Sequence, residues 1–316
     1  MDRTRAFLRD ELGLPAGDAF ALPTSGKRFE DGGQYRVEIP STEGPGALRA
    51  VVEEAARRGV QVHRVSQGSG VMLQTDAELE EMAGLASEHG IELCLFVGPR
   101  AGWDIGVQST STSGRVLGAS LRGAEQLVYA IEDVQHAVGL GVRSVLVADV
   151  GQLMVLGQMK RRGALPGDLV LKVSVSLPVA NPATARVFED LGAGSLNLPV
   201  DLPLPSIAAI RDAVDLPLDV YIEAPDDFGG PIRHYEIPEL VRVAAPIYLK
   251  FTVRNAPSTY PAGQHLEATV LALSRERVRR AEIGLEILHR YYPDSVSCPR
   301  SPSARPRLSD APVRGR

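Results

Sequence analysis

Short runs rich in valine, isoleucine and leucine recur along this chain at a nearly constant spacing, with amphipathic stretches between them. Eight such runs, the candidate strands, begin near Tyr35, Val60, Ile91, Val142, Asp168, Gly194, Leu218 and Ile247. Most successive starts lie about 25 residues apart, which is the length of a strand, a crossover helix and their turns. This period predicts an α/β fold, a single (β/α)8 barrel of the TIM type.

The predicted barrel spans residues 34–292 as one domain. Residues 1–33 form an N-terminal extension, which we expect to cap the lower end of the barrel, and the last barrel helix is expected over roughly Leu266 to Tyr292. Beyond Pro293 the chain is rich in Ser, Pro and Arg and poor in apolar residues. This composition is typical of disorder, so residues 293–316 are predicted to be a disordered tail.

Charge and cysteine content exclude several classes of function. The chain has 34 Lys+Arg and 39 Asp+Glu, a net charge of −5, which argues against nucleic-acid binding. Its two cysteines, Cys94 and Cys298, are too few for an iron–sulfur cluster held by four thiolates or for a disulfide framework. The sequence shows neither the apolar core of a signal peptide nor a membrane span, so we expect a soluble, cytoplasmic protein with no membrane partner.

Polar residues alternate with apolar ones along several predicted strands, although barrel interiors are ordinarily filled with branched apolar side chains. On the fifth strand Lys172 and Ser174 share one face, while Leu171 and Val173 suit packing under helices. Similar polar faces on other strands comprise Arg36 and Glu38; Ser195 and Asn197; Asp219, Tyr221 and Glu223; and Tyr248, Lys250, Thr252 and Arg254. We expect these faces to point into the barrel rather than at the helices.

Active sites of (β/α)8 barrels lie at the C-terminal ends of the strands. We therefore predict that the catalytic residues are Lys172, Lys250, Glu223 and Asp149. A lysine in such a pocket can form a Schiff base, hold a carboxylate, phosphate or enolate as a point charge, or make a structural ion pair with Glu38 or Glu223. The sequence leaves these three roles open.

Other polar residues near the predicted strand ends are candidates for substrate binding. They are Glu38, His63, Arg64, Arg100, Ser174, Asn197, Arg233 and Arg254. The last two arginines lie near the glycines of DDFGG and PSTYPAG, where backbone donors could hold an anion. Cofactors stay open: a divalent metal is one possibility, with Glu38, Asp149 and Glu223 as candidate ligands and His63 nearby.

The interval before the fourth strand is about twice as long as the others and is too long for a plain connection. It contains the glycine- and Ser/Thr-rich segment GPRAGWDIGVQSTSTSGRVLGASLRG. We interpret this segment as an active-site loop. Trp103 and the run Ser109 to Ser113 could form a lid, and a flexible surface loop is the alternative.

Four segments carry a resemblance to a known family. They are EIPSTEGPGAL, RGAEQLVYAIEDVQHAVGLGVRSVLVADVGQL, LKVSVSLPVANPATARVFEDLGAGSLNLPVDL and IEAPDDFGGPIRHYEIPELVRVAAPIYLKF. Over about residues 20–255 the chain resembles bacterial proteins labelled U32-family peptidases, and this resemblance implies a TIM-like barrel. Better-understood U32-type proteins resemble cluster-dependent hydroxylases or collagenase-like enzymes that rely on grouped cysteines. This chain lacks that cysteine set, so no cluster ligand or peptidase nucleophile is transferred to it.

Three functions follow as hypotheses. The first is an enzyme that acts on a small polar carbonyl, carboxylate or phosphate metabolite by acid–base chemistry of the lyase, aldolase or isomerase type. The second is a peptidase or other hydrolase, which follows from the resemblance alone. The third is a non-catalytic barrel subunit, which the apolar Val150 beside Asp149 and the segment SLPV favour. A homo-oligomer is expected because most soluble oligomers are assemblies of one chain.

Overall fold

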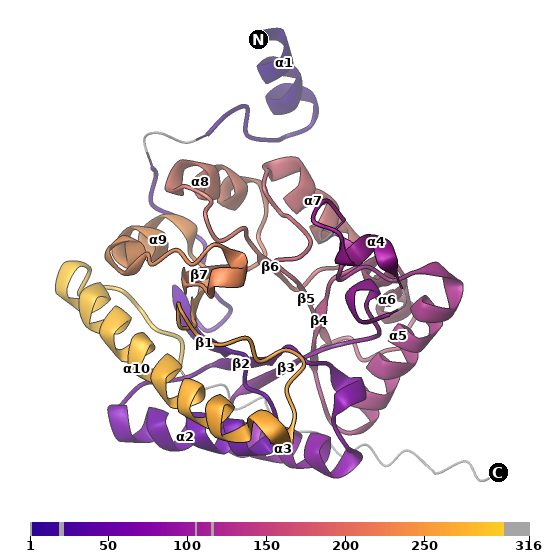
Figure 1. Cartoon of the computed structure of the whole chain (residues 1–316). Coiled ribbons are helices and arrows are strands. Elements are labelled where there is room, and N and C mark those ends of the chain that lie inside the picture. Colours follow the sequence, from indigo (N-terminus) through magenta and orange to yellow (C-terminus); the bar gives the residue numbers. More distant parts are fainter. Residues whose placement is uncertain (1, 19–21, 105, 115–116, 300–316) are drawn as a thin grey trace.

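The computed structural model describes residues 2–18, 22–104, 106–114 and 117–299. Its parallel strands follow one another in chain order and close into a barrel, as the strand period predicts (Figure 1). The strands are β1 (Tyr35–Pro40), β2 (Arg64–Gln67), β3 (Glu92–Phe96), β4 (Ser144–Val147), β5 (Val170–Val173), β6 (Ser195–Asn197), β7 (Leu218–Glu223) and β8 (Ile247–Phe251). The largest displacement from the predicted starts is at β2, which begins at Arg64 rather than near Val60.

Helices surround the barrel, and the longest of them lies along α2 (Figure 1). The main helices are α2 (Pro45–Arg58), α3 (Asp76–Glu88), α5 (Gly123–Gly139), α6 (Val150–Arg161), α7 (Pro182–Leu191), α8 (Leu204–Ala213), α9 (Ile237–Ala244) and α10 (Glu267–Tyr291). Local sequence signals set their ends. Thr75 and Glu78 form a capping box at the start of α3, and Gly59 ends α2 in the left-handed region, with φ of 66°.

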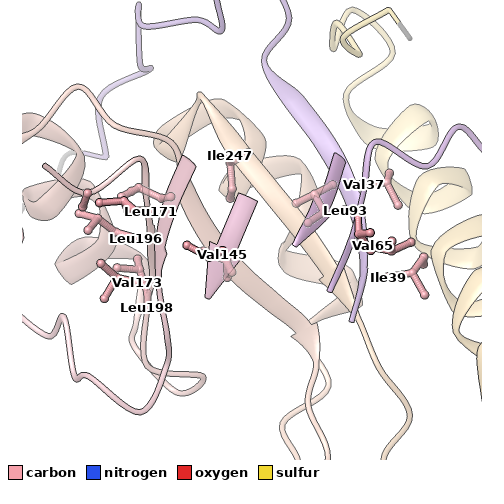
Figure 2. Packing of buried hydrophobic residues seen from close by; sticks show 14 of the residues in the cluster. Val37, Ile39, Val65, Leu93, Val145, Leu171, Val173, Leu196, Leu198 and Ile247 are labelled. Carbon is pink, nitrogen blue, oxygen red and sulfur yellow. The ribbon is translucent and has the colours of Figure 1, made fainter. Parts of the chain in front are cut away.

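One face of each strand packs against the helices. Figure 2 shows this layer, in which the labelled side chains include Val37, Ile39, Val145, Leu171 and Val173. These residues alternate with the polar positions, and they are fully buried. The predicted parity is therefore confirmed: because Leu171 and Val173 face the helices, Lys172 between them faces the barrel interior.

Residues 25–33 of the N-terminal extension close the lower end of the barrel. Ser25 Oγ donates a hydrogen bond to the carbonyl of Ala245 at 2.5 Å. The ring of Phe29 meets that of Tyr248 edge to face, with 5.4 Å between centroids, and the guanidinium of Arg36 lies 4.2 Å from the Phe29 ring. These contacts close the end of the barrel opposite to the one where catalysis is expected.

The predicted start of the disordered tail falls too early. Val296 O accepts hydrogen bonds from the amides of Gln34 and Tyr35, and the amide of Cys298 donates to Tyr35 O at 3.1 Å. Residues 293–299 thus follow the start of β1, and Cys298 is buried beside Phe29. This backbone pairing does not depend on side-chain hydrophobicity, so composition misses it. Residues 300–316 of the predicted tail lie outside the described residues.

Among the residues that the structure describes, no helix is both long enough and apolar enough to cross a bilayer.

Candidate functional site

A network of buried charges occupies the centre of the barrel, and the Glu38 carboxylate is its first hub. Glu38 accepts hydrogen bonds from Lys172 Nζ and, at 2.6 Å, from Ser66 Oγ. The strand register explains the convergence, because Glu38 on β1 pairs with Arg64 on β2 and with Lys250 on β8. Residues paired across neighbouring strands project to the same side, so these side chains meet inside the barrel.

Asp219 on β7 is the second hub of this network. Its carboxylate accepts a hydrogen bond from Ser195 Oγ at 3.0 Å and from Arg64 Nη1 at 3.2 Å. Lys172 Nζ lies 3.5 Å from Asp219 Oδ2, so this ammonium bridges both carboxylates. Lys172 also donates to Ser66 Oγ at 3.2 Å. Lys172 therefore has hydrogen-bonding partners around it and makes the structural ion pair with Glu38 that was one of its predicted roles.

Opposite charges decide the ionisation of the network. Glu38, Lys172 and Asp219 have no exposed surface. Burial alone would raise the pKa of Glu38, but the positive charges of Lys172, Lys250 and Arg64 outweigh burial and hold that pKa well below its usual value. Glu38 is consequently a carboxylate at neutral pH, and its charge is shared among three cations.

Lys250 is the cation with the fewest partners in this network. Its Nζ lies 3.6 Å from Glu38 Oε1, beyond hydrogen-bonding distance, and 4.0 Å from the centroid of the Tyr221 ring. Within the described part of the chain, Lys250 Nζ makes no hydrogen bond, although an ammonium has three N–H donors. The Tyr221 ring belongs to a small apolar cluster with Val200 and Ala224 beyond the ends of β6 and β7. Lys250 therefore has donors left for another acceptor.

Ser174 and Asn197 carry polar side chains on the interior face at the upper ends of β5 and β6. Ser174 Oγ accepts a hydrogen bond from the amide of Ser176 at 3.2 Å. Asn197 is 2% exposed, and its Oδ1 has no hydrogen-bonding partner among the described residues. A buried, unpaired amide oxygen is costly, so Asn197 is suited to accept a hydrogen bond from a ligand.

Glu223 does not join the lysines. The pairing of β7 with β8 shifts register between Tyr221 and Glu223, and Glu223 is placed opposite Phe251, which packs among the helices. Its Oε2 lies 3.6 Å from His234 Nε2 and 3.7 Å from Arg280 Nε on α10. A β-bulge reverses the alternation of side chains, so the predicted inward direction of Glu223 is wrong.

Asp149 is placed as a helix cap. Its Oδ1 accepts a hydrogen bond from the amide of Gln152 at 3.0 Å at the start of α6, and its Oδ2 accepts from the amide of Leu121 at 3.2 Å. Both carboxylate oxygens thus satisfy backbone donors, as is usual for an N-cap aspartate. This position ties the long loop before α5 to α6 and accounts for Asp149 without a catalytic step.

His63 and Arg64 lie toward the lower end of the barrel. His63 Nδ1 accepts a hydrogen bond from the amide of Val37 at 3.0 Å, so its Nε2 donates to Cys298 O at 2.9 Å. Arg64 is 1% exposed, its Nε lies 2.8 Å from Glu92, and its guanidinium stacks 3.5 Å from the centroid of the Tyr248 ring. Their contacts place both side chains in the closed half of the barrel.

The remaining three arginines lie at the upper end. Arg100 donates to the carbonyls of Gly68 at 3.0 Å and Ser69 at 3.3 Å. Arg233 pairs with Glu236 at 2.7 Å.

Arg254 pairs with Asp226 at 3.3 Å, and the acid of this pair comes from the DDFGG segment itself. The predicted anion-binding loop therefore carries its own counter-charge.

The long loop after β3 is folded rather than extended: it contains α4 (Val107–Thr110) and lines a cavity of about 190 Å³ beside Ser109 and Arg122.

The candidate metal ligands are not brought together. Glu38 lies in the charge network, Asp149 caps α6, and Glu223 faces His234 and Arg280. Across residues 2–18, 22–104, 106–114 and 117–299, no group of three or more His, Cys, Asp or Glu side chains could hold a metal ion.

Three residues of the network, Asp219, Ser195 and Ser66, were not among the predicted site residues. Strand parity did predict that Asp219 and Ser195 point into the barrel, but it did not distinguish them as members of the site. Ser66 has the same parity as Arg64 on β2, but the sequence around it lacks a clear alternation of polar and apolar residues.

Comparison with known proteins agrees with this architecture. Residues 110–224 match the model of peptidase family U32, and a comparison with curated proteins found no match. The solved structure of the U32 peptidase Mk0906 is similar over 65% of this chain and 74% of that chain, with 20% identity and a TM-score of 0.40. A Rubisco-like protein from Rhodopseudomonas palustris has 12% identity and a TM-score of 0.50 over 87% of this chain and 70% of that chain. The chain is a (β/α)8 barrel whose residues 110–224 are similar to peptidase family U32.

Proposed function

We propose that this barrel is an enzyme that binds a small anionic metabolite at its upper end and stabilises negative charge on it with Lys250. The metabolite class is a carbonyl compound that bears a carboxylate or phosphate, and the chemistry is of the lyase, aldolase or isomerase type. One observation carries the proposal: the Lys250 side chain is 2% exposed, its Nζ lies 3.6 Å from Glu38, and this Nζ has unused hydrogen-bond donors in the described part of the chain.

The surroundings of Lys250 support this role. The Glu38 carboxylate and the face of the Tyr221 ring both lie beside the Lys250 ammonium, at 3.6 Å and 4.0 Å, and each attracts a cation. An ammonium held in this way can donate a hydrogen bond to a carbonyl oxygen as negative charge develops there, which is the main requirement of enolate chemistry. Asn197, whose Oδ1 lacks a partner, would orient a donor group of the same ligand.

Lys172 takes a different part in this proposal. It is bound to Glu38, Asp219 and Ser66, so we assign it a positioning role that fixes the Glu38 carboxylate. Glu223 and Asp149 are assigned no proton-transfer step because their carboxylates are engaged elsewhere.

A thermal-shift screen of 2-oxo acids and sugar phosphates tests the proposal, with the Lys250→Met variant as its control. We expect at least one compound to stabilise the native protein and to lose this effect in the variant. A stabilising compound that acts equally on both proteins would contradict the role of Lys250. Borohydride trapping with such a compound then separates a Schiff base from an electrostatic role, because only the former leaves a modified lysine.

A non-catalytic barrel is the second candidate, because the charges of Lys172, Arg64, Glu38 and Asp219 neutralise one another and fill the interior. Under this alternative no compound of the screen binds at Lys250. A hydrolase is the third, suggested by the family match alone, and cleavage in a fluorogenic peptide library would support it.

A further inference from the structure

The connection between β8 and α10 crosses over the upper ends of β1 and β2 (Figure 1). We refer to residues 254–266 as the β8–α10 loop. Most of its residues are exposed, and Thr259 is its one buried position. A segment with so few buried contacts opens at a small free-energy cost relative to the barrel.

The loop is fastened to the barrel at its middle. The Tyr260 hydroxyl is hydrogen-bonded to Ser41 Oγ after β1, and the amide of Ala262 donates to Ser69 Oγ at 2.8 Å after β2. The Tyr260 ring lies directly against Gly68: a Cβ atom on this glycine would fall 2.8 Å from the Tyr260 hydroxyl oxygen. Only a glycine at position 68 leaves room for the docked ring.

The surface that receives Tyr260 is unusually well fixed. The Glu43 carboxylate accepts hydrogen bonds from the amides of Gly68 at 2.7 Å and Ser69 at 3.1 Å. Arg100 donates to the carbonyl oxygens of the same two residues. Every backbone polar group of this dipeptide is therefore held by a charged side chain, so the docking surface keeps its shape when the loop moves.

The other anchor carries backbone strain. Ser41 has a φ of 57°, in the left-handed region that residues other than glycine seldom adopt. Arg277 on α10 holds it there by donating to Ser41 O at 2.8 Å, and Arg277 is 4% exposed. Strained residues persist where surrounding contacts impose them, and they concentrate at ligand clamps and moving segments.

The docked loop lies next to the proposed binding group. Tyr260 is anchored at Ser41, three residues beyond Glu38 on β1, and both Glu38 and Tyr221 pair with Lys250 across neighbouring strands. Tyr221 is the ring against which Lys250 lies. Lys250 itself is 2% exposed, so a ligand needs a path to it.

We propose that the β8–α10 loop is a lid over the upper end of the barrel, which Tyr260 latches against Gly68 and Ser41 and which opens to admit ligand to Lys250. The proposal rests on the proposed function for its ligand, but access to Lys250 can be measured without any ligand. Opening replaces the two anchoring hydrogen bonds with bonds to water, and closing restores a water-poor environment around Lys250.

Acylation with acetic anhydride tests the lid directly, because the chain contains four lysines, Lys27, Lys160, Lys172 and Lys250. The test variant is Gly68→Ala, whose methyl group collides with Tyr260 but whose φ lies outside the left-handed region, so the backbone itself tolerates alanine. The matched control is Gly84→Ala on α3, where an added methyl group meets nothing within 4 Å.

In full-length protein we expect Gly68→Ala to raise the rate of Lys250 acylation about tenfold, as mass spectrometry of the peptides would measure, with Lys27 and Lys160 unchanged as internal references. Gly84→Ala should match the native protein. Hydrogen exchange at the Ala262 amide should quicken in Gly68→Ala alone. Unchanged acylation of Lys250 would overturn the lid, whether or not the Ala262 amide exchanges faster.

If Gly68→Ala alters the circular dichroism spectrum, Tyr260→Ala replaces it, because it removes the latch without adding a clash. The same acylation rates are expected, and protection of Lys250 in this variant would also overturn the lid. A failure of the proposed function, in contrast, would appear as ligand binding that survives Lys250→Met while the acylation result stands.

Discussion

Lys172 and Glu38 are separated by 134 residues in the sequence and form an ion pair at the centre of the barrel. Neither side chain is exposed, and Ser66 donates to the same carboxylate oxygen. The pair joins β1 to β5 across the interior, where most barrels of this type place branched apolar side chains. A pair of this kind adds little net stability over an apolar core, but loss of one partner leaves a buried charge uncompensated.

Lys172→Met should therefore lower the free energy of unfolding by about 3–5 kcal/mol. Urea unfolding at pH 7 would measure it. The double variant Lys172→Met with Glu38→Gln should cost less than the two single changes together, because it removes both charges. Additive costs would contradict the direct ion pair.

Lys250→Met should cost less stability than Lys172→Met, about 1 kcal/mol, because Lys250 makes no hydrogen bond in the described part of the chain and gives up its contact with the Tyr221 ring and a longer ion pair, at 3.6 Å, with a carboxylate that keeps two other cations. Urea midpoints of the two variants at equal pH measure the difference. An equal loss in both would show that Lys250 is structural.

The loss of folding stability at acid pH should depend on the ionisation of Glu38. Its pKa in the folded protein lies well below the ordinary value of 4.5, so its ionised form contributes stability that is fully present above pH 4.5. That contribution is lost progressively as pH falls below 4.5 toward the folded-state pKa. Urea midpoints taken at successive pH values should fall steeply below pH 4.5 in the native protein and less steeply in Glu38→Gln. Parallel curves for the two proteins would contradict the assignment.

Glu223→Gln should lower stability by about 1–3 kcal/mol, because Glu223 Oε2 faces Arg280 and His234 in a buried position. The glutamine retains an oxygen that can accept the hydrogen bond that the Arg254 amide donates to Glu223 Oε1 at 2.7 Å. Turnover, once a substrate is found, should survive in this variant at a temperature where it is folded. Loss of turnover in a folded Glu223→Gln protein would show that Glu223 is a catalytic residue.

Phe29→Ala should cost about 3–5 kcal/mol, since its buried ring seals the lower end against Tyr248 and Arg36. Phe7→Ala is the matched control, because Phe7 is 54% exposed. Thermal unfolding of both variants gives the comparison, and similar melting temperatures would show that residues 25–34 do not stabilise the barrel.

The strand period and the parity of Lys172 predict the barrel and its charged interior, because both are local consequences of the two-residue repeat of a strand. The same reasoning fails at Glu223, where a register shift reverses the alternation. Nor does it distinguish a lysine that is hydrogen-bonded from one that is not: Lys172 and Lys250 look alike in the sequence, and their distances to carboxylates on distant strands make them different. The sequence does not predict the backbone hydrogen bond between Cys298 and Tyr35, because such bonds do not depend on amino-acid composition.

The central claim is that Lys250, and not Lys172, supplies the cation for the ligand. Calorimetric titration of a stabilising 2-oxo acid or sugar phosphate into the native protein and into Lys250→Met tests it most directly. We predict binding about 10- to 100-fold weaker in the variant, the loss of one charge-assisted hydrogen bond. Equal dissociation constants in the two proteins would contradict the claim.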